Sequence, residues 1–145
     1  MTVQELWEKF VSKNDLKDAT YEAWAFGDDP DELARLVDAG IKTGTSSAYA
    51  LYALAGEEVP KHGDYSVILN GSGEAVCIVR NRAVTLLPYR EVTARHACME
   101  GEGDRSLAYW RSVHERFFRK ELAAIGQKFS EDMLVVFEEF EKLYP

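Results

Sequence analysis

The sequence predicts an α+β fold, because helical patterns fill its first half and β-rich segments joined by tight turns occupy much of its second half. Three apolar runs, at 65–69, 75–80 and 83–87, are typical of strands, and the glycine-rich turn at 70–74 makes the first two a hairpin. The β-branched and aromatic run at 133–144 is expected to be the last strand. Short turns between strands indicate an antiparallel sheet or a small barrel.

The first twenty residues are expected to form a helical extension. Thr2 would cap the helix, Glu5 completes a capping box, and apolar residues follow at helical spacing. Polar residues at 14–17 end this pattern. The next segment, 21–28, places aromatic residues at nearly alternate positions, which predicts a short extended segment packed against the core.

Two further helices are expected on either side of a polar turn. Residues 29–40 begin with an Asp-Pro pair, close a second capping box at Glu32 and end on a glycine, which together predict a helix. Residues 46–54 are good helix formers, and Thr45 or Ser46 would cap them. The backbone N–H groups at the start of that helix would then offer a site for an anion.

Two more helices separate the third predicted strand from the last one. Residues 91–99 form a short helix by composition, and Asp104 would cap a long helix that Gly126 ends. His114 lies close to the apolar face of the long helix, which favours a structural role for it.

Length and composition favour one domain. At 145 residues and 46% hydrophobic, the chain is long enough for one buried core and short for two. No run approaches the roughly 18 apolar residues of a membrane span, and the N-terminus lacks the features of a secretory signal, so a cytoplasmic protein is expected. Cys77 and Cys98 have no clustered partner, which predicts buried thiols.

The charge is negative overall but unevenly distributed. A net charge of −8 argues against a protein that binds long nucleic acid through phosphate neutralisation. Residues 80–121, however, hold nine Lys/Arg against six Asp/Glu, which gives +3 there and −11 elsewhere. A basic patch on an acidic body would suit a short or single-stranded ligand better than a long duplex.

Several short motifs occur in a specific order. The motif Gly40-x-Lys42-x-x-Thr45 follows Trp24-x-Phe26-Gly27-Asp28 and precedes Gly63-Asp64, and the run Glu100-Gly101-Glu102-Gly103-Asp104-Arg105-Ser106-Leu107 comes later. In this combination the chain resembles the ASCH superfamily of PUA-like β-barrels, and the last motif resembles the larger bacterial subgroup of that family.

The resemblance implies a small mixed or antiparallel β-barrel with surrounding helices, in a single domain over 1–145. Residues 1–20 would be an N-terminal helical extension, and 21–145 the barrel core with an inserted helix at 104–125. The resemblance also implies a cleft at the Gly-x-Lys-x-x-Thr loop and an association with RNA or nucleosides.

Two activities follow from different branches of the family. Some members resemble ribonucleases that act on single-stranded RNA, whereas a shorter branch deacetylates N4-acetylcytidine with lysine, threonine and glutamate. That triad maps onto Lys42, Thr45 and, through the pattern His-Ala-x-x-Glu, Glu100. The inserted residues 101–104 and the extra long helix depart from the shorter branch and leave the substrate open.

For amide hydrolysis, the triad residues have separate expected roles. Thr45 could attack the carbonyl carbon, although a plain helix cap is the alternative for this residue. Lys42 could act as the base or stabilise the oxyanion, and Glu100 could position the amine or carry a proton.

For RNA cleavage, Lys42 and the neighbouring helix start could hold phosphate. The carboxylates of Glu100, Glu102 and Asp104 could gather a divalent cation such as Mg²⁺. Acids separated by glycines are, however, also typical of a solvated turn, and Asp104 is the obvious cap of the next helix. No residue is assigned as a metal ligand. His96, one helical turn before Glu100, could carry a proton near neutral pH.

Further residues are candidates for substrate binding, as phosphate contacts or as stacking platforms for a base. These are Arg80, Arg82, Arg105 and Arg111, together with the aromatic residues Trp24, Phe26 and Tyr49. Core packing is the alternative for the aromatic residues.

The leading hypothesis is therefore a hydrolase that cleaves single-stranded RNA. The alternatives are an amidohydrolase acting on acylated cytidine nucleosides and a non-catalytic RNA-binding module. The sequence leaves open whether the chain forms an oligomer.

Overall fold

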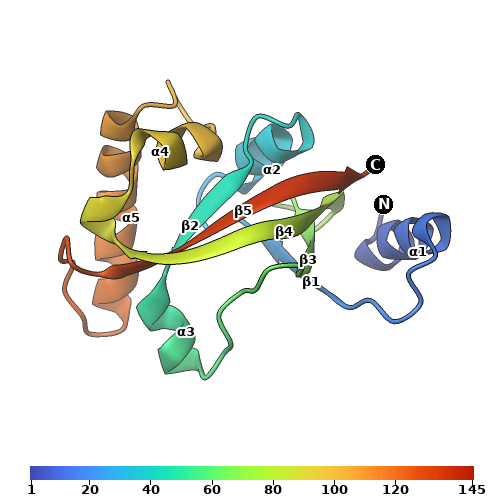
Figure 1. The fold of residues 1–145 in the computed structure, drawn as a ribbon, viewed down its shortest axis with the longest axis horizontal. Coiled ribbons are helices and arrows are strands. Elements are labelled where there is room, and N and C mark those ends of the chain that lie inside the picture. The colour runs from blue at the N-terminus through green and yellow to red at the C-terminus, as the bar shows by residue number, and fades with distance from the viewer.

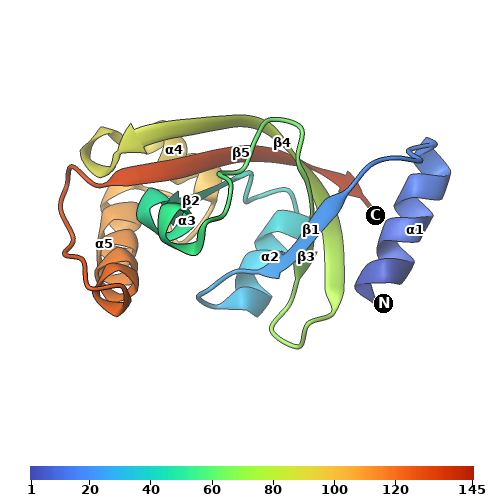
Figure 2. The same cartoon turned by 90° about the horizontal axis from the view of Figure 1, so that it is seen from below.

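A five-stranded sheet organises the chain. A computed structural model describes residues 1–145. The strands of the sheet are β1 (Tyr21–Ala25), β2 (Gly44–Ala48), β3 (Tyr65–Leu69), β4 (Ala75–Pro88) and β5 (Leu134–Tyr144). The spatial order is β1-β3-β4-β5-β2, with β1 parallel to β3 and every other pair antiparallel. The sheet curls into a half barrel whose edges are β1 and β2 (Figures 1 and 2).

Five α-helices and one short 3₁₀ turn surround the sheet. They are α1 (Val3–Asn14), α2 (Pro30–Asp38), α3 (Tyr49–Ala55), the 3₁₀ turn (Tyr89–Glu91), α4 (Ala94–Glu100) and α5 (Leu107–Ala124). Helices α4 and α5 lie at one end of the sheet, and α1 lies at the other end beside both termini (Figure 1). None of the helices combines the length and the apolar character that crossing a membrane requires. The α+β prediction is thus confirmed.

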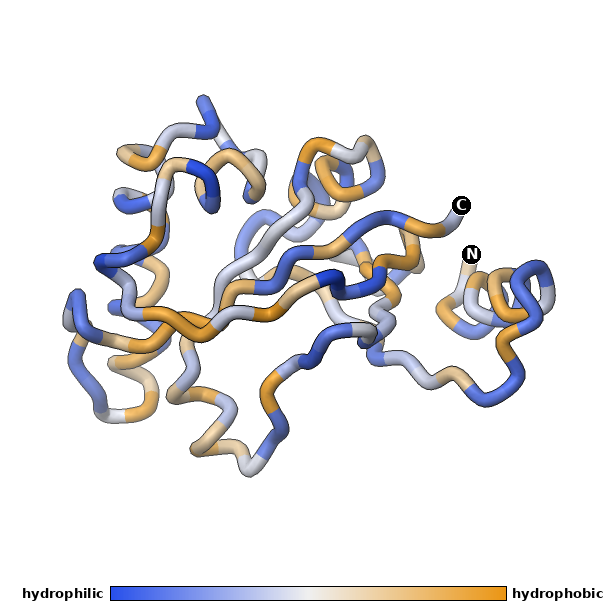
Figure 3. The backbone as a smooth tube through the Cα atoms, viewed as in Figure 1, coloured by the Kyte–Doolittle hydropathy of each residue, from blue (hydrophilic) through white to orange (hydrophobic).

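Helix α1 confirms the predicted N-terminal helix. The Thr2 side chain accepts a hydrogen bond from the backbone N–H of Glu5, as an N-cap should. Leu6, Trp7 and Phe10 are buried against β3 and β4, so the apolar stripe of this helix covers one end of the sheet. In Figure 3, where the backbone is coloured by the hydropathy of each residue, the apolar residues of α1 are the orange segments that recur along the helix.

The helix predicted at 46–54 is wrong in its first half. Residues 44–48 form the edge strand β2, whose residues are alternately buried and half-buried, and α3 begins only at Tyr49. A side chain at Gly44 would meet the Phe137 ring at 2.6 Å, so this strand lies too close to β5 for a larger residue. Thr45 and Ser46 are therefore strand residues, and the predicted helix cap and anion site at this point do not exist.

Three smaller predictions also need correction. The two strands predicted on either side of residues 81–82 are one strand, with an irregularity where Asn81 is buried. Asp29 holds the N-cap position in a left-handed backbone conformation (φ 46°), but its side chain makes no capping bond. Ser106 caps α5, and Asp104 instead accepts a hydrogen bond from the backbone N–H of Ser106.

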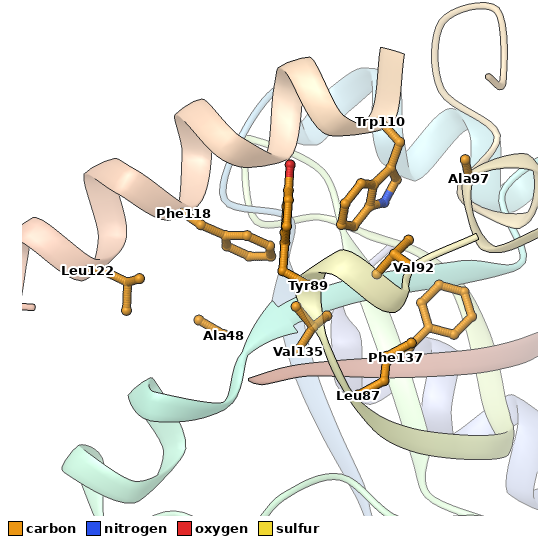
Figure 4. Close-up of a cluster of buried hydrophobic side chains, with 10 residues drawn as sticks. All are labelled: Ala48, Leu87, Tyr89, Val92, Ala97, Trp110, Phe118, Leu122, Val135 and Phe137. Carbon is orange, nitrogen blue, oxygen red and sulfur yellow. The ribbon is translucent and has the colours of Figure 1, made fainter. Parts of the chain in front are cut away.

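The largest core cluster fixes α5 against the sheet (Figure 4). Trp110, Phe118 and Leu122 of α5 are buried with strand residues such as Val135 and Phe137. Trp110 therefore has its ring in the core, while His114, one turn later in α5, faces Glu100 at the end of α4.

The two cysteines differ in their surroundings. Cys77 is buried on β4, as predicted, and burial raises the pKa of its thiol to about 12. Cys98 is exposed on α4, so the prediction of a buried thiol is wrong there, because the helix turns this position toward solvent.

Candidate functional site

The site is built around Lys42, which lies in the connection between α2 and β2. Gly40 takes a left-handed conformation (φ 76°) that ends the helical path, and the backbone N–H groups of Ile41 and Lys42 both donate to the Leu36 carbonyl. The N–H of Thr43 then donates to the Met99 carbonyl at 2.7 Å, which ties this connection to α4. As a result, the Lys42 side chain points inward and is only 1% exposed.

The Lys42 ammonium has three acceptors. Its Nζ lies 3.0 Å from Glu100 Oε1, 3.0 Å from Glu102 Oε2 and 3.3 Å from the Glu100 carbonyl oxygen. These acceptors match the three hydrogens of an ammonium group. The Phe26 ring lies 5.3 Å away and offers its face to the same charge.

Glu100 is the buried carboxylate of the site. It ends α4, and Gly101 follows it in a left-handed conformation (φ 71°) that brings the backbone against the Lys42 loop. A side chain at Gly101 would meet the Ile41 carbonyl oxygen at 2.6 Å, so this approach requires glycine. Glu100 Oε2 accepts hydrogen bonds of 2.6 Å from the Ser46 hydroxyl and from the Trp110 indole N–H.

His114 completes the cluster from α5. Its Nε2 lies 3.5 Å from Glu100 Oε2, and its Nδ1 lies 3.0 Å from the Trp110 carbonyl oxygen. The imidazole stacks on the Trp110 ring, with 4.2 Å between ring centroids and 12° between planes. The histidine is therefore fixed by its own helix and faces the carboxylate.

The electrostatics of the cluster favour charged groups. Burial alone would raise the pKa of Glu100, but the positive charges of Lys42 and His114 outweigh it and hold that pKa well below its usual range. Burial alone would lower the pKa of His114, but the negative charge of Glu100 outweighs it and raises that pKa. Glu100 is thus a carboxylate throughout the neutral range, and His114 binds a proton more readily than a free histidine does.

A pocket with a volume of about 80 Å³ opens onto this cluster. Its polar wall consists of Lys42, Thr45, Ser46, Glu100, Glu102, His114 and Asp28, and its apolar wall of Phe26, Leu33, Val113 and Phe117, with Gly27 completing the lining. The Glu102 side chain is 17% exposed and lies on the solvent side of the buried Lys42–Glu100 pair. Of the two carboxylates that contact Lys42, Glu102 is therefore the one that a ligand reaches first.

The three residues of the predicted triad all line this pocket, but they do not contact one another equally. Lys42 and Glu100 form a direct ion pair. Thr45 lies on β2 next to Ser46, and both residues line the pocket. The Thr45 hydroxyl makes no hydrogen bond to Lys42 or Glu100, whereas the Ser46 hydroxyl binds Glu100 directly.

The predicted substrate-binding residues separate into two groups. Phe26 lines the pocket, and Trp24 packs edge-to-face on it with a centroid distance of 4.9 Å. The others, Tyr49, Arg80, Arg82, Arg105 and Arg111, are not part of the pocket lining. Instead, the guanidinium of Arg80 lies over Tyr65, and Arg105 donates two hydrogen bonds to the Cys98 carbonyl.

The cation considered for Glu100, Glu102 and Asp104 can be compared with the geometry of these residues. Donor atoms of Glu100, Glu102 and His114 lie within 4.8 Å of one another, but Asp104 is not among them. The Lys42 ammonium contacts both carboxylates at 3.0 Å and already supplies a positive charge to them. Mg²⁺ requires oxygen ligands in near-octahedral geometry. Here the two carboxylates are already paired with an ammonium group, and the third group is an imidazole, so this set of ligands does not suit Mg²⁺.

His96 has a capping role rather than a place in the pocket. Its Nδ1 accepts the backbone N–H of Thr93 at 2.9 Å and completes a capping box at the start of α4. Burial lowers its pKa, and it is not among the residues that line the pocket.

Three functional candidates were missed by sequence reasoning, namely Ser46, Trp110 and His114. Ser46 was missed because residues 44–48 were expected to be a turn and a helix start. Trp110 and His114 are four residues apart and therefore share one helix face, a spacing that indicates a common target. Only the packing of α5 shows that this target is Glu100.

Comparison with known proteins supports the fold and the family. A model of the ASCH domain matches residues 22–144. The structure of an ASCH domain from Lactobacillus crispatus JV V101 superposes with a TM-score of 0.92 at 33% identity, covering 98% of this chain and 94% of that one. Protein EF3133 from Enterococcus faecalis V583 gives a TM-score of 0.90 at 35% identity, covering 98% and 88%.

A more distant structure, the hypothetical protein PH0355, shares the fold alone. It has a TM-score of 0.58 at 17% identity and covers 86% of this chain and all of that one. No curated protein matches the sequence. With the family model spanning most of the chain, the protein belongs to the ASCH domain family, which is generally linked to the binding of RNA or nucleotides.

Proposed function

We propose that this protein hydrolyses the amide bond of an acylated nucleobase or nucleoside of the N4-acetylcytidine type. The observation that carries this proposal is the buried Lys42 ammonium held between Glu100 and Glu102 at the base of a partly apolar pocket. A fixed positive charge in a water-poor site can stabilise the oxyanion that forms when a carbonyl group is attacked.

The charge around the pocket favours a neutral substrate over a phosphate group. Even with His114 protonated, it and Lys42 are outnumbered by three carboxylates in the lining, those of Asp28, Glu100 and Glu102, and no arginine lines the pocket. A phosphate 4 Å from an uncompensated carboxylate would be repelled by about 4 kcal/mol at an effective dielectric constant of 20. This repulsion disfavours ribonuclease activity at this site, although the sequence alone ranks that activity first.

The two glutamates then have different roles. Both carboxylate oxygens of Glu100 already have partners, so Glu100 positions Lys42 and does not exchange protons with the substrate. Glu102 is the more accessible of the two and can take a proton from an attacking water molecule. Turnover requires Glu102 to exchange its contact with Lys42 for a contact with that water.

The apolar wall suits a planar base. Phe26 and Phe117 line the pocket, and Trp24 packs edge-to-face on Phe26. Aromatic side chains bind unstacked bases through their faces. Thr45 also lines the pocket and is expected to contribute to binding rather than to attack the substrate.

The test is turnover of N4-acetylcytidine, followed by absorbance. Wild type should release cytidine, and Glu102→Gln should lower kcat by about 10²- to 10⁴-fold because it removes a general base. The matched control is Lys61→Met, which removes a lysine from an exposed pair with Glu58 and should leave turnover unchanged. Wild-type protein that binds the nucleoside without converting it would contradict the proposal.

A further inference from the structure

The proposed hydrolysis leaves one requirement unmet, because an amine leaves only as its nitrogen is protonated. Resting on that proposed function, we infer that His114 is a further catalytic residue and acts as the general acid that protonates the departing nitrogen. The pocket lining includes His114 together with Glu102, so both can reach one bound substrate.

The hydrogen bonds of the ring determine where its protons lie. The Trp110 carbonyl oxygen can only accept, so the Nδ1 atom 3.0 Å away must carry a hydrogen. The second proton of the imidazolium is then on Nε2, on the side of Glu100. The Nε2 to Oε2 distance of 3.5 Å is longer than an ordinary hydrogen bond, so the contact with Glu100 is mainly electrostatic, and the Nε2–H group can turn its hydrogen bond to a ligand in the pocket that His114 lines.

The charged groups around His114 favour its protonated form. Glu100 at the end of α4 and Glu102 in the loop that follows it both face the ring, and Asp28 lines the same pocket. Lys42 is the one cation in the lining besides His114, and its charge is shared by two carboxylates. Consistent with this balance, the pKa of His114 is raised even though the residue is buried.

The proton balance of the reaction closes within the cluster. Water attacks the carbonyl carbon and gives one proton to Glu102, and the C=O electron pair moves to the oxygen that faces Lys42. The C–N bond then breaks with its electron pair on nitrogen, which takes the Nε2 proton of His114, while the C=O bond re-forms. Glu102 returns its proton to His114 through one water molecule, which can bridge donor atoms that lie within 4.8 Å of each other.

The alternative is a purely structural role for His114, because its ring also packs on Trp110 and Phe118. The two roles give different outcomes in one experiment. The experiment compares wild type, His114→Gln, His114→Ala and the control His62→Gln, which alters an exposed histidine. N4-acetylcytidine turnover is measured from pH 5 to pH 9, with and without added imidazole. Thermal unfolding of each variant shows whether it is folded.

For a general acid, His114→Gln should lower kcat by about 10²- to 10⁴-fold with little change in KM. The kcat of wild type should fall on the alkaline side, with an apparent pKa above the ordinary value of about 6.5, and this fall should vanish in the variant. Imidazole should restore activity to His114→Ala at least tenfold.

Two results would overturn this role. One is a folded His114→Gln that turns over within threefold of wild type. The other is a loss of kcat that imidazole does not rescue, with the alkaline limb unchanged, since this is the behaviour of a structural residue. Wild-type protein without turnover would instead overturn the proposed function, and the role of His114 with it.

Discussion

Replacing Lys42 by methionine tests the energetics of the site. Methionine keeps most of the length and the apolar character of the lysine stem but removes the charge. Glu100, which is 1% exposed, would then be a buried carboxylate without its cation. We expect this variant to fold but to be clearly less stable than wild type.

The magnitude follows from the partners that remain. Removing one partner of a buried ion pair typically costs about 3–5 kcal/mol. Glu100 keeps its hydrogen bonds to Ser46 and Trp110, and Glu102 can turn toward solvent, so the lower end of this range applies. For an m-value of about 2 kcal/mol/M in urea, a loss of about 3 kcal/mol lowers the unfolding midpoint by about 1.5 M.

The assay is urea unfolding followed by circular dichroism at pH 7 and at lower pH. Lys42 is the largest of the charges that hold the pKa of Glu100 down, so its loss lets burial raise that pKa, and protonation of Glu100 then relieves the cost of the buried charge as the pH falls. The deficit relative to wild type should therefore shrink between pH 7 and pH 4. The control Lys61→Met breaks an exposed pair and should change stability by less than about 1 kcal/mol.

A loss of less than about 1 kcal/mol for Lys42→Met would refute this reasoning, because it is the cost of an exposed pair. A deficit that stays constant from pH 7 to pH 4 would also refute it, because the buried carboxylate would then not be the origin of the cost.

Three further predictions concern the surroundings of the site. The lowered pKa of Glu100 contributes stability that is complete above its unfolded pKa of about 4.3 and is lost as the pH falls toward the native value, so Glu100→Gln should flatten the acid limb of the stability curve. Gly101→Ala should cost about 1–3 kcal/mol in urea unfolding, and Gly126→Ala less, because both are left-handed but only Gly101 lies against backbone atoms; equal losses would contradict this. Iodoacetamide should alkylate only Cys98 in the native protein and should reach Cys77 only after unfolding, as measured by mass spectrometry.

The sequence predicted those parts of the fold that depend on local chemistry. The Thr2 cap, the hairpin turn after β3 and the apolar run of β5 are each determined by neighbouring residues, and the structure has them where the sequence placed them. Residues 44–48 were assigned incorrectly, because Gly-Thr-Ser-Ser-Ala has no apolar periodicity. This segment becomes a strand through pairing with β5, which is more than 80 residues away in the chain.

The same distinction applies to the site. Lys42 and Glu100 were named from the resemblance to a family, and they lie 58 residues apart in sequence, so local patterns say nothing about their distance. The contribution of Ser46, Trp110 and His114 depends on how β2 and α5 pack around α4. Glu102 was considered as a metal ligand, but its contact with Lys42 places it in an ion pair.

The most direct test of the central claim offers both substrates to one preparation of the wild-type protein. N4-acetylcytidine and end-labelled single-stranded RNA with Mg²⁺ are incubated in parallel, and the products are identified by mass and by gel. The wild-type protein should release acetate and cytidine while the RNA stays intact. Cleaved RNA together with unchanged N4-acetylcytidine would contradict it.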